Sequence, residues 1–151
     1  MPIPEKNVDK RSGLPDTVNM EAGIRQLCAF IPYFASVDPD LACQWKGGER
    51  REDGIVIMPY PVYSEAFMQF VSAFYKSNLE ERDYLDKLDQ MVPDWKTADM
   101  SRVIENADFE LVRVVLTKAI RVERFCDGAW HDSIRSGLFL NILRRLEVLT
   151  Q

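Results

Sequence analysis

Apolar residues recur at helical spacing through most of the chain, and the first such stripe starts near residue 20. Met20, Ile24, Leu27 and Ile31 are separated by three or four positions, which places them on one face of an α-helix. Pro32 has no N–H to continue the helical hydrogen bonds. The pattern therefore predicts an amphipathic helix that kinks or ends near Pro32.

A second helix is predicted directly after Ser64, whose hydroxyl suits an N-cap. The apolar residues that follow fit the i, i+3, i+4, i+7, i+8 spacing of one helical face: Phe67, Phe70, Val71, Phe74 and Tyr75. This helix is expected to form part of the core.

The second half of the chain also has a helical pattern, beginning with an acidic stretch. Residues 79–110 hold ten Asp and Glu against four Lys and Arg, a local net charge of −6, which is typical of a solvated face. Asp108 is predicted to cap an apolar helix that runs from Phe109 to about Glu123. Gly137 is expected to end a short helix before the last one.

One region breaks the helical pattern, at about residues 42–60. The β-branched run Ile55-Val56-Ile57 and the preceding polar loop of residues 47–54, which begins and ends with glycine, favour a β-hairpin. The prolines at positions 59 and 61 predict a further extended segment before Ser64. The predicted fold is mainly α: a compact bundle-like domain of six or seven helices with one inserted β-hairpin, covering residues 18–151. Residues 1–17, with three prolines, are expected to form a flexible arm.

Composition narrows the functional classes. The chain has 151 residues and a net charge of −5, which disfavours broad binding to nucleic-acid phosphates. Neither a membrane-spanning run nor the apolar segment of a secretory signal is evident in the sequence, and the three cysteines are far apart without metal-binding spacing. We therefore expect a cytoplasmic protein with reduced thiols, no membrane association and no cofactor.

Candidate chemistry is concentrated in residues 121–137, which contain the single histidine. Arginine pairs suit phosphate or carboxylate recognition, and aromatic side chains from the hairpin region could line a pocket beside them. The candidate ligand-binding residues are Arg121, Arg124, Tyr60, Tyr63, Trp45 and His131. A structural alternative is that the arginines pair with the acidic middle of the chain and that the aromatic rings belong to the core.

The same segment also allows a catalytic and a metal-binding interpretation. Cys126 and His131 could form a nucleophilic pair in a small hydrolase-like enzyme, and Asp127 and Asp132 could join them as metal ligands. The simpler interpretation makes Asp127 a helix cap, Cys126 a small buried residue and His131 a surface side chain. The chain has one histidine, and these residues do not follow a known metal-binding spacing. The sequence therefore favours the simpler interpretation, and we predict neither catalytic nor metal-binding residues.

Several motifs together resemble a small prokaryotic family known only as a domain of unknown function. They are the Trp45 to Gly48 segment, Pro59-Tyr60-Pro61-Val62-Tyr63-Ser64, the Arg121 to Gly128 segment with its Arg-Phe-Cys-Asp-Gly, and Ile142-Leu143-Arg144-Arg145-Leu146. The resemblance implies one compact domain and carries no activity that could be transferred.

The leading functional interpretation is a non-catalytic module that binds a protein or a small anionic ligand, and homo-oligomerisation is left open. The first alternative is the small hydrolase that uses Cys126 and His131. The second is weak nucleic-acid association in a regulatory role, through the arginine-rich C-terminal third, although the acidic composition makes nucleic acid the less favoured partner.

Overall fold

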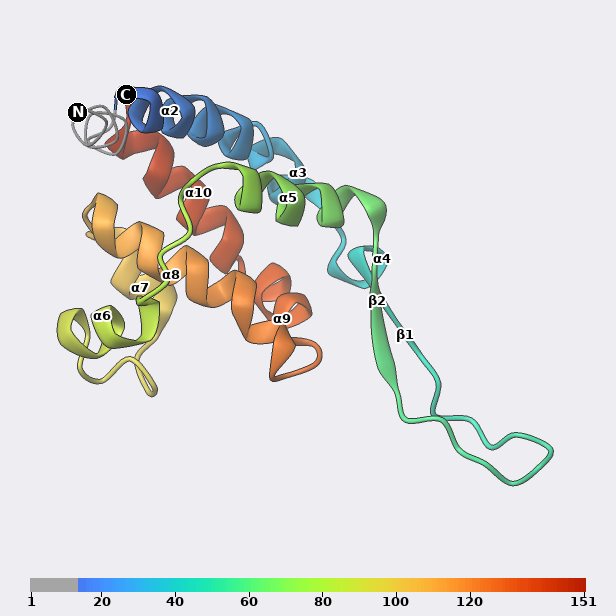
Figure 1. Cartoon of the computed structure of the whole chain (residues 1–151). Helices are drawn as coiled ribbons and strands as arrows, with labels where there is room; N and C mark the ends of the chain where they lie inside the picture. The colour runs from blue at the N-terminus through green and yellow to red at the C-terminus, as the bar shows by residue number, and fades with distance from the viewer. Residues whose placement is uncertain (1–13) are drawn as a thin grey trace, which may run out of the picture.

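The computed structural model describes residues 14–151, with side chains from Met20 onward, and its architecture is mainly helical (Figure 1). The first helices are α2 (Leu14–Cys28), α3 (Ile31–Ser36) and α4 (Pro39–Ala42). The predicted break near Pro32 is confirmed, because α2 ends at Cys28 and Pro32 lies in the first turn of α3. Residues 1–13 of the expected arm lie outside the described residues, and α2 begins at Leu14, four residues before the expected start of the domain.

The predicted β-hairpin is present, and its strands are β1 (Cys43–Lys46) and β2 (Tyr60–Tyr63). They pair antiparallel, with Cys43 opposite Tyr63 and Lys46 opposite Tyr60. The second strand is therefore later than the sequence suggested, since residues 55–57 form only the isolated bridge between Arg50 and Val56. Prolines at positions 59 and 61 favour extended backbone, and a two-stranded sheet leaves one edge of each strand open, where a missing N–H is tolerated.

Side-chain N-caps set the starts of two helices that follow the hairpin. Ser64 accepts a hydrogen bond from the backbone N–H of Phe67 and so begins α5 (Glu65–Lys76), as predicted. Asp108 accepts from Leu111 N–H and begins α8. The other elements of the second half are α6 (Tyr84–Met91), α7 (Met100–Glu105), α8 (Phe109–Arg121), the 3-10 turn η1 (Val122–Arg124), α9 (Ala129–Ser136) and α10 (Leu138–Leu149).

Gly137 separates the last two helices, as the sequence predicted. Its φ is 83°, in the left-handed region that glycine adopts without strain, and it serves both as C-cap of α9 and as N-cap of α10. The chain therefore turns sharply between two helices that remain in contact.

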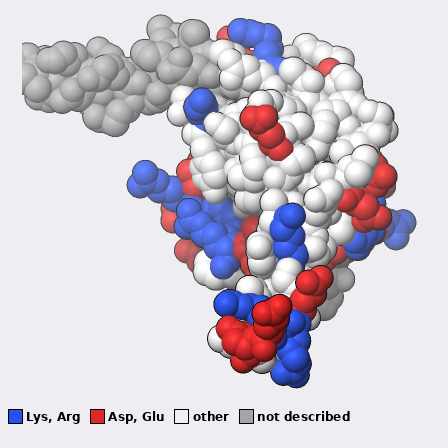
Figure 2. Space-filling model, turned by 90° about the vertical axis from the view of Figure 1, so that its right-hand side faces the viewer, with Lys and Arg blue, Asp and Glu red and all other residues white. Residues whose placement is uncertain are grey.

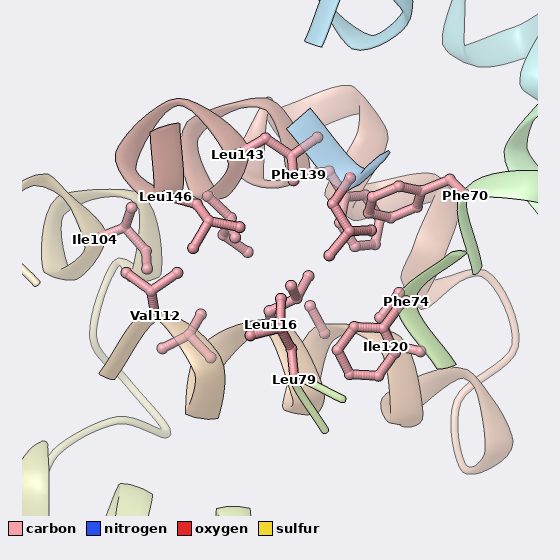
Figure 3. Packing of buried hydrophobic residues seen from close by; sticks show 14 of the residues in the cluster. Phe70, Phe74, Leu79, Ile104, Val112, Leu116, Ile120, Phe139, Leu143 and Leu146 are labelled. Atoms are coloured by element: carbon pink, nitrogen blue, oxygen red, sulfur yellow. The ribbon is translucent and has the colours of Figure 1, made fainter. Parts of the chain in front are cut away.

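The core lies between α8 and α10, with α5, α7 and α2 around them (Figures 1 and 3). In Figure 3, apolar side chains from α5, α7, α8 and α10 and from the loop after α5 point toward one another: Phe70, Phe74, Leu79, Ile104, Val112, Leu116, Ile120, Phe139, Leu143 and Leu146. The predicted stripes supply this core, because Phe67, Phe70 and Phe74 of α5 are fully buried. Tyr75, at the edge of the same stripe, remains exposed. In residues 14–151, none of the helices combines the length and apolar character needed to cross a membrane.

The hairpin is the part of the fold that leaves the body. Figure 1 shows it extending away from the helices, with its base beside α4 and the start of α5 and its tip far from the core. We call residues 43–63 the hairpin arm. The arm is held at its base, where Trp45 and Tyr63 meet His131.

Phe139 provides a test of the core. Its ring is fully buried and lies against Phe34, Phe67 and Phe70, with ring centroids 5.6, 5.6 and 5.3 Å away. Removing a buried phenyl group costs about 3–5 kcal/mol through lost burial and the cavity it leaves. We expect Phe139→Ala to lower the free energy of unfolding by that amount in urea titrations.

Phe125→Ala is the matched control, because the Phe125 side chain is 79% exposed. Its free energy of unfolding should stay within about 0.5 kcal/mol of the wild-type value. Equal losses in the two variants would contradict the assignment of Phe139 to the core.

Candidate functional site

The base of the hairpin arm meets the corner between α8 and α9, and Trp45 makes this contact. A Cβ added to Gly128 would lie 2.6 Å from Cζ2 of Trp45, so the indole packs directly on the glycine backbone. Gly128 also has a φ of 92°, in the left-handed region. Glycine is therefore required at this corner for two reasons: the turn itself and the close approach of the arm.

The carboxylate of Glu123 is the polar centre of the same corner. It accepts hydrogen bonds from the backbone N–H groups of Gly128 (3.0 Å) and Trp130 (2.8 Å) at the start of α9. Its two oxygens also lie 3.0 and 3.1 Å from the hydroxyl of Tyr63, which donates to it from β2. One side chain thus satisfies the open N–H groups of a helix N-terminus and binds the hairpin to it.

The expected cap at this position was wrong. The sequence favoured Asp127, but the N-cap residue of α9 is Gly128, without a side-chain cap, and Asp127 is exposed. Glu123, five residues before Gly128, acts as the cap instead, because the turn η1 directs its side chain back to the start of α9. Its spacing matches none of the capping patterns read from sequence.

Tyr63 connects the arm to α9 through two hydrogen bonds. Its hydroxyl donates to Glu123 and accepts from the backbone N–H of His131, 3.2 Å away. Burial, followed by the negative charge of Glu123, holds the pKa of Tyr63 well above its usual range. The phenol therefore keeps its proton and remains a donor. Its ring packs on Trp130 and Phe67, with centroids 5.1 and 5.3 Å away.

His131 is buried, with 6% of its surface exposed, so the expectation of a surface side chain was wrong. Its Nδ1 accepts a hydrogen bond from Nε1 of Trp45 at 3.3 Å, which assigns the proton of a neutral ring to Nε2. That nitrogen lies 3.4 Å from a carboxylate oxygen of Asp40, and Nη2 of Arg135 lies 3.2 Å from both ring nitrogens. The imidazole joins β1, α4 and α9, and sequence spacing gave no sign of these partners.

The predicted site is therefore only partly assembled. Trp45, Tyr63 and His131 come together at the corner, joined by Glu123, Asp40 and Arg135, which sequence reasoning missed. Tyr60 stands apart: it is exposed, and the alternation of a strand places it on the opposite face from Tyr63.

The two arginine candidates also lie apart from this contact. Arg121 binds Glu80 through Nη1 at 2.6 Å and lies over the ring of Tyr84, 5.7 Å from its centroid. The structural alternative, pairing with the acidic middle of the chain, is thus confirmed for Arg121. Arg124 is exposed at the end of η1, and it forms no ion pair with the side chains of residues 20–151. Because Arg121 is paired with Glu80, the two arginines cannot both be free to bind an anion.

Cys126 does not form a catalytic pair with His131 in the described part of the chain. The thiol is exposed, whereas the sequence favoured burial, and both nitrogens of His131 face Trp45, Asp40 and Arg135. Among the side chains from Met20 onward, no group of three or more His, Cys, Asp and Glu is arranged to hold a metal ion. The geometry of this corner is that of a structural joint.

The fold and this joint define a class of protein: a small helical domain from which one anchored β-hairpin projects. The chain belongs to DUF6508, a family of unknown function, whose model matches residues 19–151. Comparison with curated proteins and with solved structures gave no significant match.

The capping role of Glu123 is tested by substitution. Glu123→Ala leaves two N–H groups of α9 and the hydroxyl of Tyr63 without their acceptor, and an unsatisfied partly buried group costs about 1–3 kcal/mol. We expect a loss of that size in the free energy of unfolding from urea titrations. Asp127→Ala is the matched control and should change it by less than about 0.5 kcal/mol. If Asp127→Ala proved the more damaging change, the assignment of the cap to Glu123 would be wrong.

The three thiols should differ in reactivity in the native protein. Burial raises the pKa of Cys28 to about 11 and raises that of Cys43, and the thiolate is the reactive form. With a thiol reagent near neutral pH we expect one fast equivalent, from exposed Cys126, and its loss in Cys126→Ser. Cys28 should begin to react only as the pH approaches about 11. Fast reaction of two or three thiols near neutral pH, without unfolding, would contradict the partial burial of Cys28 and the burial of Cys43.

Proposed function

We propose that this domain is a non-catalytic protein-binding module and that the hairpin arm is its binding element. The observation that carries the proposal is the concentration of exposed apolar side chains on the arm. Met58 is 79% exposed and Ile55 53%. The other large apolar residues exposed on the arm are Trp45, Val56, Ile57, Tyr60 and Val62. Exposed apolar side chains concentrated on one element in this way mark interaction sites in soluble proteins.

The arm is firmly held where it joins the body, which suits a binding element. The Tyr63–Glu123 and Trp45–His131 hydrogen bonds fix its base to α9. Beyond the base, a two-stranded hairpin alone is marginal in water, so contact with a partner would stabilise it. A fixed base also lowers the ordering entropy that binding must overcome.

The charges of the arm favour a protein partner over nucleic acid. Its tip carries both signs, with Glu49, Glu52 and Asp53 beside Arg50 and Arg51. Acidic and basic side chains lie close together on the projecting part at the bottom of Figure 2. Phosphate backbones require a net positive surface, which this tip does not offer.

The hydrolase alternative has less support, because the exposed Cys126 lacks the base that would activate it and His131 is engaged by other side chains. Recognition of a small anion would depend mainly on Arg124, since Arg121 is neutralised by Glu80. A single exposed arginine is a weak site for an anion in water.

Site-specific photo-crosslinking tests the proposal. A photoreactive phenylalanine analogue placed at Met58 should form covalent adducts with a protein in the cells that naturally produce this chain. The matched control is the same analogue at Val148 on α10, which is 57% exposed but lies on the body. We expect discrete adducts from position 58 and none from position 148. Absence of adducts from position 58, or the same adducts from both positions, would contradict a binding role for the arm.

A further inference from the structure

We propose that the base of the hairpin arm is a pH-sensitive joint: protonation of His131 releases the indole of Trp45, and the arm then stays bound to α9 through Tyr63. The attachment of the arm thereby depends on pH, whatever the arm binds. The geometry behind this joint is one buried imidazole placed between an indole donor, a carboxylate and a guanidinium.

The hydrogen bond between Trp45 and His131 exists only while the imidazole is neutral. Nδ1 of His131 needs its lone pair to accept from Nε1 of Trp45, 3.3 Å away. An indole N–H can only donate, and both nitrogens of an imidazolium are donors, so the two groups cannot bond once the ring is protonated. Histidine is the side chain that ordinarily takes up a proton between about pH 8 and 5. One proton therefore breaks the hydrogen bond between β1 and α9.

Each state of the ring is supported by a different neighbour. Nε2 of His131 lies 3.4 Å from Oδ1 of Asp40 on α4, and this carboxylate can hold an imidazolium in a charge-assisted hydrogen bond. Nη2 of Arg135 lies 3.2 Å from both ring nitrogens and, as a like charge, favours the neutral ring. Protonation thus exchanges the bond to Trp45 for a stronger one to Asp40.

Four further ionisable side chains from the elements packed around this ring belong to the same corner: Cys43, Tyr63, Glu123 and Asp132. Asp132 pairs with Arg135 at 3.2 Å, and Glu123 connects to the backbone of His131 through the hydroxyl of Tyr63. Burial raises the pKa of Cys43, and burial together with the charge of Glu123 raises that of Tyr63. The thiol and the phenol therefore keep their protons in the range in which a histidine titrates.

The release of Trp45 is a local event. Its side chain lies at the surface, with 47% of the residue exposed, so the indole N–H can turn to water when its acceptor is lost. The hydroxyl of Tyr63 still donates to Glu123 and still accepts from the backbone N–H of His131, because protonation of the ring changes none of these groups. The arm then loses one of its two hydrogen-bonded attachments to α9 and moves about the other.

The indole N–H signals of the full chain, followed by NMR between about pH 8 and pH 5, test the joint. We expect the indole proton of Trp45 to move upfield, the direction of a lost hydrogen bond, with the same midpoint as the ring signals of His131. The indole of Trp130 is the internal control, because it donates to the carbonyl of Ile120 at 2.9 Å, which does not titrate. A Trp45 signal that stays constant, or that changes only as the Trp130 signal is lost by unfolding, would overturn the inference.

His131→Asn separates protonation of this ring from other effects of acid. The amide oxygen of asparagine can accept from Trp45 near the position of Nδ1 and does not titrate, so the Trp45 signal should stay constant over the same range. The same change with pH in wild type and His131→Asn would overturn the role of the imidazole.

Two charge variants test the joint even if His131→Asn does not fold. Asp40→Asn removes the anion beside the ring and should lower the midpoint of the Trp45 change by several tenths of a pH unit. Arg135→Gln removes the like charge and should raise the midpoint by a similar amount. Asp53→Asn, at the tip of the arm, is the matched control and should leave it unchanged. Shifts of the same direction in Asp40→Asn and Arg135→Gln, or none in either, would overturn the inference.

The consequence for the arm is measured on the same samples. The backbone ¹H–¹⁵N heteronuclear NOEs of residues 43–63 should fall as the pH passes below the midpoint of the Trp45 change, because the arm has lost one attachment. Those of α10 (Leu138–Leu149) should stay constant. An arm that is equally ordered on both sides of the midpoint would show that His131 does not control its attachment.

Discussion

The attachment of the hairpin arm to the helical body depends on the carboxylate of Glu123. A partly buried anion requires donors, and here they come from a helix N-terminus and from a tyrosine on a distant strand. Hydrogen bonds from these three donors therefore begin α9 and attach β2 to it. Because Tyr63 keeps its proton, the strand remains a donor to this carboxylate over the physiological pH range.

This joint explains why the hairpin arm is held at one end and free at the other. Trp45 packs on Gly128 and donates to His131, so β1 is fixed to the same corner as β2. Beyond Lys46 the arm leaves the body, and its apolar residues cannot reach the core. The helical body thus supports an exposed hairpin, for which we propose a binding role.

The candidate site illustrates how far residue type alone can lead. The sequence selected Trp45, Tyr63 and His131 as unusual residues, and these three do meet in space. It placed them in a ligand pocket, whereas their polar groups are bound to one another and to Glu123 and Asp40. Aromatic and ionisable side chains at the corner of a domain can form either a ligand site or a hydrogen-bonded structural contact. Only the positions of their partner groups show which of the two is present.

The sequence by itself determined the helical class, the presence of one hairpin, and the caps at Ser64, Asp108 and Gly137. These features depend on interactions within a few residues, such as apolar periodicity and hydrogen bonds to the first turn of a helix. Tertiary structure alone decided which side chains far apart in the sequence form hydrogen bonds and ion pairs. Tyr63 and Glu123 are 60 positions apart, Trp45 and His131 are 86, and Arg121 and Glu80 are 41. Packing of the core brings these groups together, and so it decided that His131 is buried, that Glu123 caps α9 and that the arm stands exposed.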